Sequence, residues 1–228
     1  ASVESDLKWL ADMRARLREI PLASLTVEHA QEHDLLAARI ERERIELAEV
    51  RAWEKNPSFY LDLVAGSVLA VLERDFASPC ERVVLATRRL RQVPEVLRAA
   101  KVNLKNPPRI FTEVAISQFA GALDFYRRTA PSLTLECREP LIHADFAEAD
   151  SLAVHAVERF LDELRNDVLP RSTGDFALGR DLYQRRPETA EMDPAPVESL
   201  LAAGWRALDD TRNRMAAVSE RIAPGLGV

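Results

Sequence analysis

The amino-acid sequence predicts an all-α fold, a largely antiparallel bundle of about seven helices formed by residues 1–228 as a single helical region. Three observations lead to this prediction. Capping side chains stand directly before prolines, apolar residues recur at intervals of three and four, and signals for β-strands are scarce. Only Leu133, Leu135 and Cys137 alternate as a strand would, and one strand cannot form a sheet.

Four helix starts are marked by a capping residue followed by proline. The cap oxygen accepts an orphan backbone N–H, and proline at the first helical position loses a donor that had no partner. Ser78 is followed three residues later by Glu81, which is the spacing of a capping box. The four pairs are Asn56-Pro57, Ser78-Pro79, Asn106-Pro107 and Asp193-Pro194.

The apolar spacing places the helices along the chain. Pro94 is expected to kink or split the fourth helix. The third helix is apolar nearly all round, which predicts a central position. The expected helices cover residues 3–20, 26–53, 59–74, 79–102, 108–128, 146–168 and 194–222, with connections at 170–179 and 187–193. The first carries one apolar stripe that ends at Pro21: Val3, Leu7, Leu10, Leu17 and Ile20. The second is expected to turn four apolar residues inward: Leu36, Ile40, Leu47 and Val50.

The composition is that of an ordinary globular protein. Hydrophobic residues make up 47% and charged residues 30% of the chain, a balance that argues against disorder. The net charge is -6, and lysines and arginines alternate with acidic residues, so no nucleic-acid partner is expected. No apolar run approaches the ~20 residues that a membrane span needs, so no membrane partner is expected either.

The beginning of the chain and its two cysteines predict a cytoplasmic protein. Glu4 and Asp6 stand where a signal peptide would be basic and then apolar, although a signal removed before Ala1 stays open. Cys80 and Cys137 are too few and too far apart for a disulfide framework or a cysteine-based zinc site. We therefore expect two free thiols in a reducing compartment.

One short pattern resembles a metal-binding motif. Residues 29–33 read as H-x-x-E-H, which puts His29 and His33 one helical turn apart with Glu32 nearby as a base. A working site needs a third ligand on a second buried helix, and no residue is marked as that ligand by its surroundings. The pattern also lies near the helix start at Thr26, where exposure is expected. The sequence therefore favours two histidines on a partly exposed helix over a zinc site.

No catalytic, cofactor-binding or metal-binding residue is expected in the chain. His143 and His155 are isolated, no G-x-S-x-G nucleophile elbow occurs, and scattered glycines form no phosphate-binding loop. Trp53, Phe59 and Tyr60 surround an Asn-Pro pair and could line a ligand groove. Aromatic residues at a helix–helix corner more often pack that corner, which is the interpretation that we favour.

An ordered set of motifs resembles a known family. The motifs are Trp53-x-x-Asn56-Pro57-x-x-Tyr60, Arg89-Leu90-x-x-x-Pro94, Ala100-x-x-Asn103-Leu104, Pro107-Pro108 with Thr112-Glu113, Gln118-x-x-Gly121, and Phe176-x-x-Gly179-x-x-x-Tyr183. Their order and spacing extend over nearly the whole chain. In these motifs the sequence resembles the bacterial domain-of-unknown-function family eight hundred and eighty-five.

The resemblance implies a larger protein. Members of that family are much longer and are similar to helical zinc peptidases of the neurolysin and angiotensin-converting-enzyme type. Their metal site is expected in a His-Glu…Pro-Gly-His run in the C-terminal half, and that run is absent here. The resemblance thus implies an N-terminal region that walls or covers a substrate channel, with zinc bound in the full-length protein. No metal ligand of the family transfers to His29 or His33.

The same reasoning predicts the partners of the chain. The first is its own missing C-terminal half, and the second is another copy of the chain when it is isolated. The isolated chain is expected to be inactive. It is also expected to expose apolar side chains of its last helix: Leu200, Leu201, Trp205, Leu208, Met215 and Val218. The alternative, from a different class, is a stand-alone helical interaction module without catalytic activity.

Overall fold

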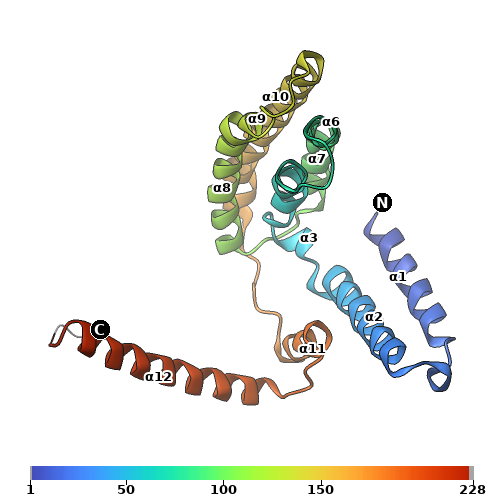
Figure 1. Cartoon of the computed structure of the whole chain (residues 1–228), viewed down its shortest axis with the longest axis vertical. Helices are drawn as coiled ribbons and strands as arrows, with labels where there is room; N and C mark the ends of the chain where they lie inside the picture. The colour runs from blue at the N-terminus through green and yellow to red at the C-terminus, as the bar shows by residue number, and fades with distance from the viewer. Residues whose placement is uncertain (1, 226–228) are drawn as a thin grey trace. The chain divides into compact units, whose positions relative to one another are not determined.

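The computed structural model describes residues 2–225, and those residues form helices, turns and loops with no strand (Figure 1). The all-α prediction is confirmed. Eight helices within the described part of the chain have eleven residues or more: α1 (Val3–Arg18), α2 (Val27–Ile45), α6 (Pro79–Leu90), α7 (Val93–Asn103), α8 (Arg109–Asp124), α10 (Pro140–Glu163), α11 (Arg180–Ala190) and α12 (Val197–Ile222).

Shorter helical segments connect or extend these helices. The short α-helices are α3 (Ala52–Lys55), α4 (Phe59–Leu61), α5 (Ser67–Glu73) and α9 (Ala130–Ser132). The 3₁₀ turns are η1 (Leu22–Ser24) and η6 (Leu169–Arg171). The π-helical segments are η2 (Glu46–Val50), η3 (Asp62–Gly66), η4 (Phe125–Thr129) and η5 (Leu164–Val168).

The chain divides into two compact units. Unit 1 comprises residues 1–50 and 178–228, and unit 2 comprises residues 51–177. Unit 1 holds α1, α2, α11 and α12, while unit 2 holds the helices from α3 to α10. Unit 2 is therefore one continuous segment of the chain, whereas unit 1 is built from two segments that are distant in sequence.

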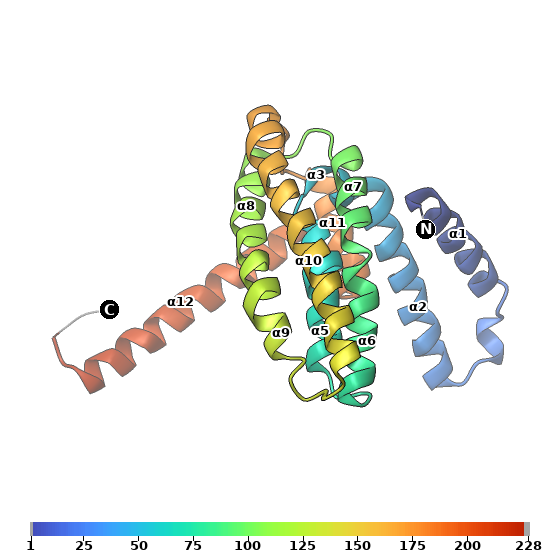
Figure 2. The ribbon, with the colours of Figure 1, turned by 90° about the horizontal axis from the view of Figure 1, so that it is seen from above.

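Helix α10 is the centre of unit 2. It packs against α6, α7 and α8, and Figure 2 shows it running between α8 on one side and α6 and α7 on the other. Its Phe160 ring meets the ring of Phe119 on α8 edge to face, with 5.0 Å between the centroids. Both side chains are buried, as are Val64 and Val68 in the segment that was expected to be central. That prediction is confirmed.

The predicted helix starts hold at one of the four positions. Ser78 and Glu81 form the capping box at the start of α6. Asn56 and Asp193 instead accept backbone N–H groups two residues ahead, and their helices begin later, at Phe59 and Val197. Asn106 likewise caps no helix, because its Oδ1 accepts the N–H of Thr173 at 3.0 Å. Short polar side chains favour such turns, and a residue before proline is held extended, so the helix starts further on.

Two prolines lie where the sequence predicted a break or a connection: Pro94 agrees with the prediction, and Pro187 does not. Pro94 lies in the first turn of α7, so the predicted fourth helix is split there. Pro187 lies inside α11, where a connection was expected. Pro131 and Pro170 each follow a π-helical segment by two residues. A proline ring clashes with the carbonyl four residues earlier, and the wider π turn relieves that clash.

Cys80 and Cys137 form a disulfide, so the expectation of two free thiols is wrong. The bond joins the first turn of α6 to the loop before α10, and the two Cα atoms are 4.7 Å apart. Fifty-seven positions separate the cysteines in sequence. They meet because α6 and α10 pack side by side, a tertiary contact that the spacing of the cysteines does not reveal.

Candidate functional site

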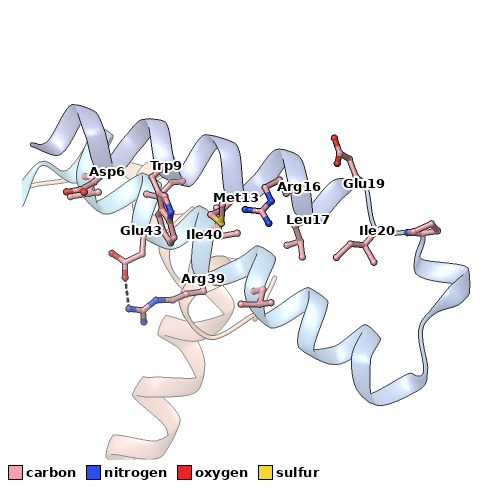
Figure 3. Close-up of a pocket in the computed structure, with 14 residues that line it drawn as sticks. Asp6, Trp9, Met13, Arg16, Leu17, Glu19, Ile20, Arg39, Ile40 and Glu43 are labelled. Carbon is pink, nitrogen blue, oxygen red and sulfur yellow. Dashed lines mark ion pairs between the residues drawn. The ribbon is translucent and has the colours of Figure 1, made fainter. Parts of the chain in front are cut away.

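An open groove of about 1040 Å³ lies between α1 and α2 in unit 1 (Figure 3). We call it the α1–α2 groove. Its apolar lining consists of Trp9, Leu10, Met13, Leu17, Ile20, Pro21, Leu36, Ile40 and Leu47. Its charged lining consists of Asp6, Arg16, Glu19, Arg39 and Glu43.

The groove arises from the helical spacing of its two walls. On α1, Trp9, Met13 and Leu17 recur every four residues and therefore lie on one face of the helix. The Trp9 side chain is 59% exposed, and Leu36 on the opposite wall is 54% exposed. The expected inward burial is therefore wrong for Leu36, because α1 and α2 approach each other without filling the space between their apolar faces.

A helix cap and ion pairs stabilise the two helices that form the groove. The hydroxyl of Thr26 accepts the N–H of His29 at 3.2 Å and so caps the start of α2. Arg14 of α1 reaches Glu41 of α2 at 3.5 Å, and Arg44 pairs with the same carboxylate at 2.7 Å. The hydrogen bond from Arg44 lowers the pKa of Glu41 below its ordinary value, so this carboxylate stays charged.

A second ionic contact fixes α11 to the end of α2. Arg185 donates to Glu49, with Nη1 3.1 Å from Oε1, and Arg44 donates to the same Oε1 at 2.8 Å. Hydrogen bonding by Arg185 lowers the pKa of Glu49. Arg186 pairs with Glu46 at 2.8 Å, one turn earlier. These pairs are partly exposed, so they orient α11 against the end of α2 more than they add to the free energy of unfolding.

The chemistry of the groove suits binding. Its floor is apolar, and its rim carries both signs of charge, with Arg39 and Glu43 paired at 2.7 Å (Figure 3). An apolar segment of a ligand can replace water on the floor, and polar groups of that ligand can meet the rim. The lining contains no histidine, cysteine, serine or threonine, so the groove supplies no nucleophile of those types.

The two histidines of the pattern lie near the start of α2, and no third candidate ligand lies beside them among the described residues. His29 is exposed in the first turn of α2. The Nε2 of His33 lies 3.3 Å from the carbonyl oxygen of Leu17, and its Nδ1 lies 3.4 Å from a carboxylate oxygen of Asp34. A carbonyl only accepts, so Nε2 carries the proton in that contact and is not free to bind a metal. No group of three potential ligands lies together in residues 2–225.

Titration of the metal-free chain with zinc is expected to show no sub-micromolar binding. The reason is that His33 must give up its contact with Leu17 and a third ligand must be recruited. Isothermal calorimetry measures the affinity, with His33→Ala as the matched variant. Tight binding that disappears in this variant would show that the inverted zinc motif operates here.

The other histidines and the aromatic corner have structural surroundings. His143 lies 3.3 Å from the hydroxyl of Thr134, and His155 lies 3.2 Å from Glu158 on an exposed surface. The Tyr60 hydroxyl donates to the carbonyl oxygen of Trp53 at 2.6 Å and accepts from Asn103 at 3.1 Å. The favoured interpretation is confirmed, because these bonds tie α3, α4 and α7 together.

Unit 2 contains one buried ionisable pair. Asp150 of α10 is buried, and burial raises its pKa to about 6. Tyr126 in η4 is also buried, and desolvation, followed by the nearby charge of Asp150, raises its pKa. The Tyr126 hydroxyl and the Oδ1 of Asp150 have no hydrogen-bond partner among the described residues. Tyr126 belongs to the hydrophobic core of unit 2 and Asp150 is buried, so the pair is part of the core.

Comparisons with known proteins identify the family of this chain. The model of a family described as "Bacterial protein of unknown function (DUF885)" matches residues 1–227. No curated protein matches the chain. A solved structure, described as that of "a putative lipoprotein of unknown function from Shewanella oneidensis", is 20% identical to it with a TM-score of 0.78.

That match covers 97% of this chain and 41% of the Shewanella chain. The present chain therefore spans about two-fifths of the length of the solved relative. At this identity the likeness shows the fold alone. Because the family model matches nearly every residue, the chain belongs to the bacterial family of unknown function DUF885.

Proposed function

We propose that this chain is the N-terminal helical region of a larger zinc-dependent peptidase, and that its α1–α2 groove lines the channel that receives the substrate. The observation that carries the proposal is the open apolar groove, present on a chain that spans about two-fifths of a solved relative. An apolar floor with a mixed-charge rim fits a peptide, whose side chains are apolar in part and whose backbone is polar.

Zinc in this proposal belongs to polypeptide outside this chain. The resemblance places the metal-binding run in the C-terminal half of the longer proteins, and the described residues offer no three-ligand set. The groove residues would bind and orient the substrate, and they would exclude water from its apolar side chains. Activation of water and stabilisation of the oxyanion fall to the remaining part of the protein.

We also propose that the protein folds in an oxidising compartment. Disulfides persist in the periplasm and outside the cell, and they are rare in the cytosol, where thiols are kept reduced. The Cys80–Cys137 bond supports this location, and the description of the Shewanella relative as a lipoprotein agrees with it. Within residues 2–225, no helix combines the length and apolar character needed to cross a bilayer.

The full-length protein is expected to hydrolyse peptides and to lose that activity to a chelator, whereas the 228-residue chain alone is expected to be inactive. In the full-length protein, Ile40→Glu should raise KM for an apolar peptide by on the order of tenfold with little change in kcat, because a charge now lies on the groove floor. The matched control is Val27→Glu, which adds the same charge on α2 at a side chain that is 80% exposed and outside the groove.

Steady-state kinetics with a peptide series measures both variants, and circular dichroism checks that each is folded. Equal KM values for Ile40→Glu and Val27→Glu would remove the groove from the substrate channel. Turnover that survives the chelator, or turnover by the 228-residue chain itself, would contradict the peptidase proposal.

A further inference from the structure

Helix α12 carries an apolar stripe that unit 1 leaves uncovered. None of its residues is buried. The stripe, defined here as the α12 stripe, consists of Leu201, Trp205, Leu208, Met215, Val218 and Ile222. These side chains are between 38% and 78% exposed, which confirms the expected apolar surface on the last helix.

The stripe has the geometry of a helix-packing face. Its members recur at intervals of four, three, seven, three and four residues, so they share one side of the helix. Twenty-one residues separate its ends, which corresponds to roughly 32 Å of helix at 1.5 Å per residue. The opposite side is polar, with residues such as Arg206, Asp209, Asp210 and Asn213. The stripe is interrupted near its middle, where Thr211 and Arg212 lie on the same side of the helix. An apolar face of that length on a regular helix is still typical of packing against other helices.

The first turn of α12 is fixed by contacts with α11, whereas the stripe is exposed. The Oε1 of Gln184 accepts the N–H of Val197 at 2.8 Å, and Arg180 pairs with Glu198. Both contacts join the first turn of α12 to α11, and they lie before the stripe begins at Leu201. The helix is therefore anchored to unit 1 at one end and presents its apolar face along the remaining length.

We propose that the α12 stripe docks against helices of the polypeptide that follows this region in the full-length protein. The match to the family model extends through α12, so this helix belongs to the family fold. The matched region makes up 41% of the chain of the solved relative, so that protein has additional polypeptide that could cover such a stripe. This inference rests on the part of the proposed function that makes the chain a region of a larger protein.

A second copy of the chain is the competing occupant. The stripe is nearly a mirror of itself, because Leu201, Trp205 and Leu208 would face Ile222, Val218 and Met215 in an antiparallel pair. The stripe can therefore pair with itself when its own polypeptide is missing, and the experiment must distinguish these two arrangements.

The test compares Leu208→Asp with Asn213→Asp, each made in the full-length protein and in the 228-residue chain. Both add one negative charge to α12, the first on the stripe and the second on the polar side. Leu208→Asp is expected to lower the melting temperature of the full-length protein by about 5 °C or more, because a charge is buried against apolar helices. In the 228-residue chain it should reduce binding of a hydrophobic dye without lowering the melting temperature, and Asn213→Asp should change neither protein.

Light scattering gives the oligomeric state of each protein. A monomeric full-length protein that binds little dye supports the inference. A full-length dimer that Leu208→Asp converts to a monomer would assign the stripe to a second copy and overturn it, as would an unchanged melting temperature in full-length Leu208→Asp. None of these measurements reads peptidase activity, so an inactive full-length protein that Leu208→Asp destabilises would refute the peptidase proposal and keep this inference.

Discussion

Reduction of the Cys80–Cys137 bond is expected to lower the free energy of unfolding of unit 2 by about 4 kcal/mol. The cysteines are 57 positions apart, and the chain-entropy relation for a loop of that length gives this figure at 25 °C. Cys137 is buried, so in the reduced folded protein its thiol stays in an apolar environment and regains little free energy by hydration. This is a large fraction of the stability of a typical domain.

Urea unfolding followed by the fluorescence of Trp53 isolates the transition of unit 2. Trp9 and Trp205 lie in unit 1 and are replaced by phenylalanine in this background. The Cys80→Ser, Cys137→Ser double variant should resemble the reduced protein, and a reductant should leave that variant unchanged. A midpoint that does not move when the wild-type protein is reduced would contradict the contribution assigned to the bond.

Alkylation of protein isolated without reductant tests the oxidising compartment separately. Labelled thiols at Cys80 and Cys137 would argue against that compartment.

Asp150→Asn is expected to raise the free energy of unfolding by about 3 kcal/mol near pH 7.5, with the gain shrinking to well under ~1 kcal/mol below about pH 4. Burial raises the pKa of Asp150 from 3.8 to about 6 in the folded protein. Between these two values the folded state binds more protons than the unfolded state, so stability falls as the pH rises through that window. The amide in the Asp150→Asn variant has no charge to desolvate, so the free energy of unfolding of that variant lacks this pH dependence.

Unfolding of both proteins at several pH values between 4 and 8 gives the difference directly. Glu148→Gln removes a carboxylate from an exposed position on the same helix and should change stability by less than ~0.5 kcal/mol. Tyr126→Phe removes a buried hydroxyl that has no partner among the described residues, and it should be neutral or slightly stabilising. A difference between Asp150→Asn and the wild type that is constant across this pH range would show that the carboxyl titrates normally.

Local rules predicted the helices well because the forces that form them are local. The segment with Val64, Val68 and Leu72 is apolar nearly all round, so its central position could be predicted from the sequence. The capping box at Ser78 needs only residues three apart, and it is present. At Asn106 the same kind of signal failed because a distant partner, Thr173, takes the cap oxygen. A competing tertiary bond of this kind leaves no mark in the local sequence.

The candidate site was less predictable because exposure depends on what packs against a helix. Leu36 and Trp205 carry the same apolar signal as a core residue, yet both are more than half exposed in the chain. Periodicity identifies the apolar face and does not say what covers it. The groove itself depends on the approach of α1 to α2, and the disulfide depends on the approach of α6 to α10. Neither approach is encoded by spacing within one helix.

The discontinuous construction of unit 1 has a consequence for synthesis on the ribosome. Glu49 and its partner Arg185 are 136 positions apart, and all of unit 2 is translated between them. At about 5–20 residues per second, α2 emerges roughly 7 to 27 seconds before the helix that pairs with it. Unit 2 can fold during this interval, whereas α1 and α2 wait as an unfinished hairpin with apolar side chains in water. A segment that emerges after unit 2 therefore completes the domain that began first.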